Sequence, residues 1–184
     1  MVELSLHVLD LIENSTAAGA TTVRVSVREN PGENAIHLTI EDDGRGIDPE
    51  LLARVTDPFV TTRTTRKVGL GIPLMKQVAE ACGGELSVSS EKGKGTTVVA
   101  RFRRDHIDRP PLGDMAATIA IAMATNPGTR FVYRHEGAGG VFEFDSFEVA
   151  RALGDVPVTD PAAFQWTKQY LRERIERAQG SERV

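Results

Sequence analysis

The stretch LSLHVLDLIENSTAA, residues 4–18, predicts an amphipathic helix. Its apolar residues are spaced i, i+4, i+7 and i+8 and would form one stripe facing a core: Leu4, Val8, Leu11 and Ile12. Asp10 and Asn14 lie four residues apart and therefore share another face of this helix. An amide oxygen can bind a hard cation such as magnesium, and a carboxylate one turn away can orient or deprotonate a water or hydroxyl. The alternative is that both side chains are solvated at the surface.

Three glycine motifs follow this helix: DDGRG at 42–46, VGLGIP at 68–73 and GKGTT at 93–97. Together with Glu-Asn-Ser at 13–15, they resemble in order the N, G1, G2 and G3 boxes of the GHKL superfamily of ATPases. This superfamily includes gyrase, heat-shock chaperones, histidine kinases and MutL. The resemblance covers residues 3–104, and four boxes in order are more specific than one. It implies the Bergerat fold, with ATP and Mg²⁺ as cofactors.

The resemblance also assigns roles to individual residues. Asp42 matches the aspartate that accepts a hydrogen bond from the adenine amino group, and Asn14 matches the magnesium ligand. Asp10 stands where gyrase, MutL and the chaperones carry a glutamate general base, and it is one methylene shorter. The resemblance thus makes Asp10 the catalytic candidate. The nucleotide-binding candidates are Asn14, Asp42, Gly44, Gly46, Ile47, Lys67, Gly69, Leu70, Gly71 and Thr96.

Within the superfamily, the run DPF at 57–59, the Thr-rich cationic loop to Lys67 and the GLG at 69–71 resemble histidine kinases. Residues 13–21, ENSTAAGAT, resemble MutL, but the downstream MutL signature is missing. Because the N box begins near residue 3, we expect a free-standing kinase-type ATPase domain without the phosphorylated helical hairpin. It is similar to anti-sigma-factor serine kinases and, more loosely, to ATP-binding proteins linked to redox-enzyme operons.

Two functions remain open at this point. The first is an enzyme, a regulatory protein kinase or ATPase, that transfers the γ-phosphate to a Ser, Thr or His of a partner or to water. The second is a non-catalytic, ATP-gated binding module. Both need the same pocket, and the shortened acid at Asp10 does not decide between them.

The hydrophobic periodicity predicts an α+β fold. Strands are expected at 22–28, 35–40, 85–90 and 96–102, and further helices at 49–55 and 72–82. The order of these elements predicts a two-layer α/β sandwich, in which a mixed sheet is covered by helices on one face.

Residues 105–113, DHIDRPPLG, are rich in proline and charge and are read as a linker. The linker separates an ATPase domain, 1–104, from a small α/β extension, 114–184. The extension has predicted helices at 114–124, 147–153 and 161–178 and strands at 130–136 and 141–144. It carries no histidine or cysteine cluster, and its last helix is rich in aromatic residues, which favours a protein partner or self-association over a second catalytic site.

Composition excludes several classes of protein. The chain has 184 residues, 40% of them hydrophobic, and a net charge of −4, so it can bury a core and is a poor candidate for binding nucleic acid. Cys82 is the single cysteine, which excludes an intrachain disulfide and a cysteine-built metal site. The most apolar run, 115–124, is too short to span a bilayer, and no signal peptide precedes the first helix. We therefore expect a cytoplasmic protein without membrane attachment.

Overall fold

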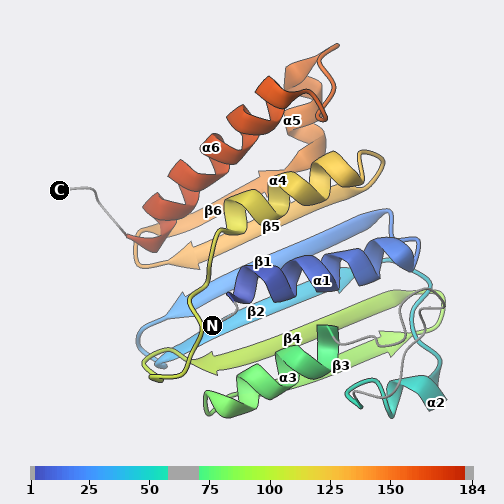
Figure 1. The fold of residues 1–184 in the computed structure, drawn as a ribbon, viewed down its shortest axis with the longest axis vertical. Helices are drawn as coiled ribbons and strands as arrows, with labels where there is room; N and C mark the ends of the chain where they lie inside the picture. The colour runs from blue at the N-terminus through green and yellow to red at the C-terminus, as the bar shows by residue number, and fades with distance from the viewer. Residues whose placement is uncertain (1–2, 58–70, 181–184) are drawn as a thin grey trace.

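The computed structural model describes residues 3–57 and 71–180, and its secondary structure follows the predicted order (Figure 1). The helices are α1 (Leu4–Ala17), α2 (Pro49–Leu52), α3 (Gly71–Ala81), α4 (Met115–Thr125), α5 (Ser146–Leu153) and α6 (Pro161–Gln179). The strands are β1 (Thr22–Asn30), β2 (Ala35–Asp42), β3 (Glu85–Glu91), β4 (Gly95–Arg103), β5 (Arg130–Gly137) and β6 (Gly140–Asp145). Lys67 of the predicted cationic loop and Gly69 and Leu70 of the G2 motif lie outside the described residues.

Helix α2 is shorter than predicted, since it ends at Leu52 and not at Val55. Two features of the sequence explain the early end. Val55 and Thr56 are β-branched, which lowers helix propensity, and Asp57 precedes Pro58, which disfavours the helical conformation at Asp57. The segment after α2 therefore continues as turns.

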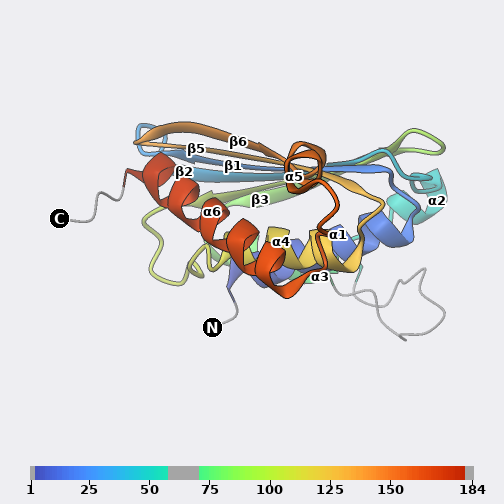
Figure 2. The same ribbon diagram turned by 90° about the horizontal axis from the view of Figure 1, so that it is seen from above.

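The six strands form one mixed sheet in the order β3-β4-β2-β1-β5-β6. Strands β1 and β5 are parallel, and all other neighbours are antiparallel. Helices α1, α3, α4 and α6 lie on the same face of this sheet, as Figure 2 shows. The prediction of an α+β sandwich with a mixed sheet and one helical layer is confirmed.

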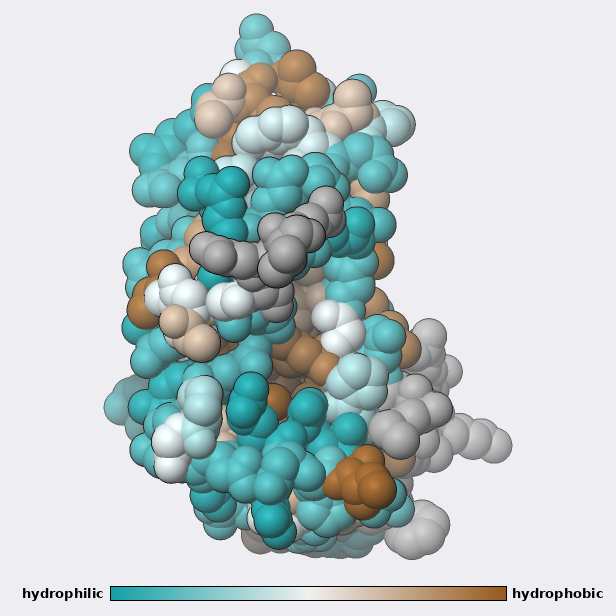
Figure 3. Space-filling view, turned by 90° about the vertical axis from the view of Figure 1, so that its left-hand side faces the viewer, coloured by the Kyte–Doolittle hydropathy of each residue, from teal (hydrophilic) through white to brown (hydrophobic). Residues whose placement is uncertain are grey.

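The apolar stripe of α1 faces this core, as its spacing predicts: Leu4, Val8, Leu11 and Ile12 are each at most 2% exposed. They pack under β1, whose alternation buries Val23, Val25 and Val27 against the helices. The described residues in Figure 3 are mostly hydrophilic, with hydrophobic residues in small groups. Among residues 3–57 and 71–180, no helix is both long and apolar enough to cross a membrane.

The C-terminal extension continues the sheet of the first part. Strand β5 pairs with β1, and helix α4 packs beside α1. The predicted linker contacts the start of α1, where the amides of Leu4 and Ser5 donate to the carbonyls of Pro111 and Leu112 at 3.0 and 2.9 Å. Both parts also contribute to one hydrophobic cluster. Whether residues 1–104 fold alone stays a prediction.

A buried polar network joins β1, β5 and the end of α6. His135 is fully buried, and its Nε2 lies 3.0 Å from Oε1 of Glu29, while its Nδ1 lies 2.8 Å from the hydroxyl of Tyr133. Gln179 Nε2 donates to the same Glu29 oxygen at 3.0 Å. The hydrogen bond from His135 lowers the pKa of Glu29 against the opposing effect of burial, and burial raises the pKa of Tyr133.

Candidate functional site

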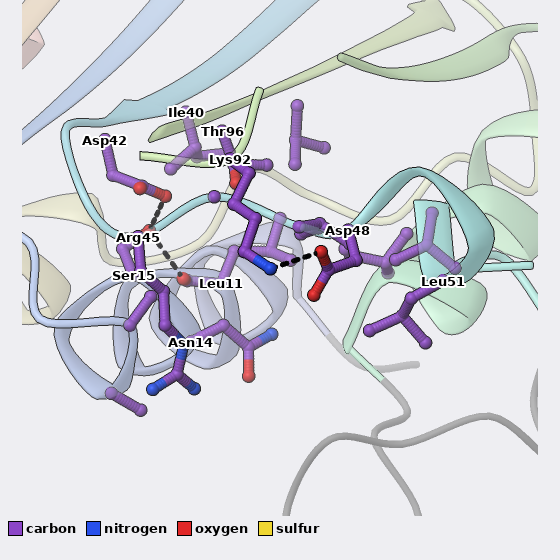
Figure 4. Close-up of a pocket in the computed structure, with 17 residues that line it drawn as sticks. Leu11, Asn14, Ser15, Ile40, Asp42, Arg45, Asp48, Leu51, Lys92 and Thr96 are labelled. Carbon is purple, nitrogen blue, oxygen red and sulfur yellow. Dashed lines mark hydrogen bonds and ion pairs between the residues drawn. The ribbon is translucent and has the colours of Figure 1, made fainter. Parts of the chain in front are cut away.

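A cavity of about 280 Å³ lies between α1, the loop after β2, the α2 segment and the β3–β4 hairpin (Figure 4). Its polar lining is Asn14, Ser15, Asp42, Arg45, Asp48, Lys92 and Thr96. Its apolar lining is Leu11, Ala17, Ala18, Ile40, Gly46, Ile47, Leu51, Val55, Ile72 and Val98. A mainly apolar cleft with a few convergent polar groups is the usual form of a small-molecule site.

Asp42 is the deepest charged group of this cavity. It ends strand β2 and is 9% exposed. Its Oδ2 accepts a 2.7 Å hydrogen bond from Ser15 Oγ, and its Oδ1 accepts one of 2.9 Å from the amide of Gly44. An ionised carboxylate has about four acceptor positions, so Asp42 is held in place and can still accept a hydrogen bond from a ligand.

Sequence reasoning missed Ser15. The serine is 4% exposed and lies one turn after Leu11, on the buried side of α1. Such a hydroxyl needs a hydrogen-bond partner, and this requirement is the signal that could have identified it. The structure supplies the partner as Asp42, which links the N-box helix to the G1 motif.

The second aspartate of the DDG sequence has a structural task. Asp43 Oδ1 accepts hydrogen bonds from the amides of Thr21 and Thr22 at 2.7 and 2.8 Å, and Oδ2 accepts one from the Thr21 hydroxyl at 2.7 Å. Burial alone would raise the pKa of Asp43, but these hydrogen bonds lower it below its usual value. Asp43 thus fixes the α1–β1 turn beside the cavity.

The glycines of the G1 motif allow close packing around the cavity. A Cβ on Gly44 would lie 3.0 Å from the Cβ of Ala18, and one on Gly46 would lie 2.2 Å from the carbonyl oxygen of Glu91. Gly46 also has φ +68°, a region that glycine adopts readily. A side chain at Gly46 would therefore push the β3–β4 hairpin away.

The β3–β4 hairpin holds the same loop through hydrogen bonds. The amide of Gly93 donates to the carbonyl of Arg45 at 2.8 Å, and the amide of Ile47 donates to Ser90 Oγ at 2.9 Å. Thr96 Oγ1 lies 3.0 Å from Ser90 Oγ and pairs across the sheet with Asp42. The G1 and G3 motifs therefore form one wall of the cavity.

A second group of predicted residues meets at the start of α3. A Cβ on Gly71 would lie 3.2 Å from Asn14 Nδ2 and 3.5 Å from Asp10 Cβ. Asn14 lines the cavity, whereas Asp10 is exposed beside it. The structure thus brings together the predicted catalytic acid, the predicted metal ligand and one glycine of the G2 motif, whose roles stay predictions.

Two observations bear on the metal and on Asp10. Among residues 3–57 and 71–180, no group of three or more His, Cys, Asp or Glu side chains could hold a metal ion. His7, one turn before Asp10, is 6% exposed, and burial lowers its pKa although Asp10 acts in the opposite direction. Burial therefore favours the neutral form of the His7 imidazole beside Asp10.

The first part of the chain is similar to known proteins. The model of the family "Histidine kinase-, DNA gyrase B-, and HSP90-like ATPase" matches residues 2–106. A Rickettsia bellii protein that carries the name of an NtrY-like sensor histidine kinase is 28% identical over 107 residues, which are 57% of this chain and 17% of that protein. The sensor protein SrrB of Staphylococcus aureus is 34% identical over 98 residues, 50% of this chain and 17% of SrrB. The chain thus spans about a sixth of the length of these relatives.

Among solved structures, the N-terminal domain of a DNA repair protein is similar in fold. The match has a TM-score of 0.54 at 18% identity and covers 79% of this chain and 52% of that one. This coverage is wider than that of the family model, so the similarity in fold extends into the C-terminal extension. With the cavity, the ordered motifs and the family match together, the chain belongs to the histidine kinase-, DNA gyrase B- and HSP90-like ATPases, and residues 2–106 are its ATP-binding domain.

Proposed function

We propose that the chain binds Mg-ATP in the cavity beside Asp42 and passes the γ-phosphate to a Ser, Thr or His of a partner protein, or to water. The observation that carries this proposal is that Asp42 and Asn14, from motifs far apart in the sequence, line one cavity. Gly71 of a third motif lies next to Asn14, since a Cβ on it would be 3.2 Å from Asn14 Nδ2. Membership of an ATPase family supports the same ligand.

The cavity has the chemistry that an adenine ring needs. Its apolar walls, including Leu11, Ile40 and Val98, offer contact to the faces of a flat base. Asp42 presents a carboxylate to the exocyclic amine of adenine, whereas guanine has a carbonyl at that position and would face it with a second acceptor. We therefore expect ATP to be preferred over GTP.

The phosphates would extend from the base toward Asn14 and the start of α3. The first amides of a helix favour anions, and Asn14 offers a neutral oxygen ligand for magnesium. When bound, Mg²⁺ would neutralise charge on the phosphates. Asp10, beside Asn14, would orient an acceptor hydroxyl or water and take its proton.

Incubation of the chain with γ-labelled ATP and magnesium tests the proposal. Label should appear in free phosphate or, when a cell extract is added, in a partner protein. Asp10→Asn should lower the rate while leaving ATP affinity nearly unchanged. Glu80→Gln, which changes an exposed acid paired with Lys76 on α3, is the matched control and should leave both unchanged. Failure of the chain to bind ATP would overturn the proposal.

A non-catalytic, ATP-gated module, like the anti-sigma or redox-enzyme-associated proteins, is the second candidate. The observation that favours it is the short, exposed side chain of Asp10 at the predicted position of the general base. In that case ATP binds, no label is transferred, and Asp10→Glu does not create activity.

For the protein partner, we propose contact through α6, either with another protein or with a second copy of the chain. Trp166 is 50% exposed and stacks on Tyr170 with ring centroids 5.4 Å apart, and Phe142 meets Tyr170 edge-on at 6.1 Å. Exposed aromatic side chains are typical anchors of interfaces. Trp166→Ala should weaken association measured by sedimentation while leaving ATP binding unchanged.

A further inference from the structure

An ion pair crosses the outer side of the cavity, where Figure 4 shows the Lys92 ammonium next to the Asp48 carboxylate. Lys92 Nζ lies 2.7 Å from Asp48 Oδ1, and both residues line the cavity. Lys92 belongs to the turn between β3 and β4, and Asp48 stands immediately before α2. The pair thus connects the β3–β4 turn to the start of α2.

The side chain of Asp48 does not cap the helix that it precedes. It is the N-cap residue of α2, where an aspartate normally accepts a hydrogen bond from the first turn of the helix, yet its side chain makes no such bond. Its carboxylate is turned to Lys92 instead. The geometry therefore favours the contact across the cavity over the local stability of the helix.

Helix α2 is held in position by contacts with neighbouring elements, such as this ion pair. It has four residues, and none of them is buried. This segment nevertheless supplies Leu51 and Val55 to the cavity wall. A single helical turn without a buried face is not stable by itself. The contacts at the start of the segment therefore determine the position of this wall.

Three contacts hold the start of the segment against the β3–β4 hairpin. Two are the hydrogen bonds from Gly93 to Arg45 and from Ile47 to Ser90, which hold the loop up to residue 47. The ion pair at Asp48 is the third and is the one nearest to α2. It is also the weakest, since the Lys92 and Asp48 side chains are 71% and 60% exposed.

We propose that Asp48 and Lys92 are positioning residues that hold the α2 wall closed over the bound nucleotide and so set how slowly the nucleotide leaves. The inference rests on the proposed binding of ATP in this cavity. Breaking the pair frees the wall, because the contact nearest to α2 is then lost. Dissociation becomes faster, and high salt has the same effect because it screens exposed charges.

The test measures dissociation of a fluorescent ATP analogue, chased with unlabelled ATP in a stopped-flow instrument. Lys92→Ala and Asp48→Ala should each raise the dissociation rate about twofold to fivefold, in keeping with an exposed ion pair, and the double variant should add nothing further. Exchanging the charges, with Asp48→Lys and Lys92→Asp together, should restore the slow rate. In 0.5 M salt all variants should converge.

The hairpin offers a matched control. Lys94 pairs with Glu91 at 2.7 Å on the same turn but does not line the cavity, so Lys94→Ala should leave the rate unchanged. If Lys92 instead contacted the nucleotide directly, Asp48→Ala would free it and slow dissociation, which would overturn the proposal. Unchanged rates in both single variants would overturn it as well. If the wild-type chain bound no ATP analogue, the proposed function would fail first, and this inference with it.

Discussion

Replacing Asp42 by Asn tests the base-recognition role most directly. The change keeps the size of the side chain and leaves one oxygen to accept from the Gly44 amide. The new amide group then occupies the place of Oδ2 beside Ser15 and presents N–H groups to the cavity. An adenine amine would meet a donor in place of a charged acceptor. Losing a hydrogen bond to a charged group gives an expected cost of ~2–4 kcal/mol, or roughly 30-fold to 900-fold in affinity.

Calorimetry with Mg-ATP and with purine riboside triphosphate, which lacks the amino group, measures this effect. For wild-type protein, the analogue should bind more weakly than ATP, and Asp42→Asn should abolish that difference. Asp43→Asn is the matched control, because Asp43 binds the α1–β1 turn and not the cavity. Unchanged ATP affinity in Asp42→Asn, with a normal unfolding transition, would refute the assignment, as would an equal loss for both ligands.

Three further predictions follow from the same structure. Asn14→Ala should weaken ATP binding in magnesium but leave metal-free ADP nearly unaffected, and an equal loss in titrations of both would indicate a structural role. The pKa of Glu29 is lower in the folded chain than its usual value of 4.5, so the ionised carboxylate stabilises the fold above pH 4.5, and this stabilisation is lost as pH falls through the folded pKa. In urea unfolding, Glu29→Gln should therefore have a lower free energy of unfolding than wild type at pH 7, and the difference should disappear in acid. Deleting residues 105–184 should preserve ATP binding at reduced stability, because β1 loses its partner β5; a truncated chain that cannot fold would show that residues 1–104 need the extension to complete their core.

Periodicity predicted the elements because each amphipathic pattern is local. The spacing of Leu4, Val8 and Leu11 decides which face of α1 is buried, and the buried residues agree. The alternation in 130–136 predicts a strand in the same way. It does not identify the strand's neighbour, since parallel pairing with β1 joins residues about a hundred positions apart.

The same difference between local patterns and long-range contacts applies to the residues of the site. The glycine motifs could be read directly because each needs a particular backbone, as Gly46 does against Glu91. The sequence did not identify Ser15 or the Asp48–Lys92 pair, because each of these side chains acts through a contact with a residue from another element. The fully buried His135 is a similar case, since its partner Glu29 lies 106 residues away in the sequence.

The network at Glu29 also sets an order of events during synthesis. Glu29 leaves the ribosome before its partners, because His135 follows 106 residues later and Gln179 150 residues later. Until then, β1 has an open edge on the side that β5 will occupy, and the Glu29 carboxylate, which the folded chain leaves 19% exposed, stays in water. Chains grow at roughly 5–20 residues per second, so this interval lasts on the order of 10 s. Strand β1 is thus made well before the strand that encloses it, and a nascent-chain chaperone could bind its open edge during this interval.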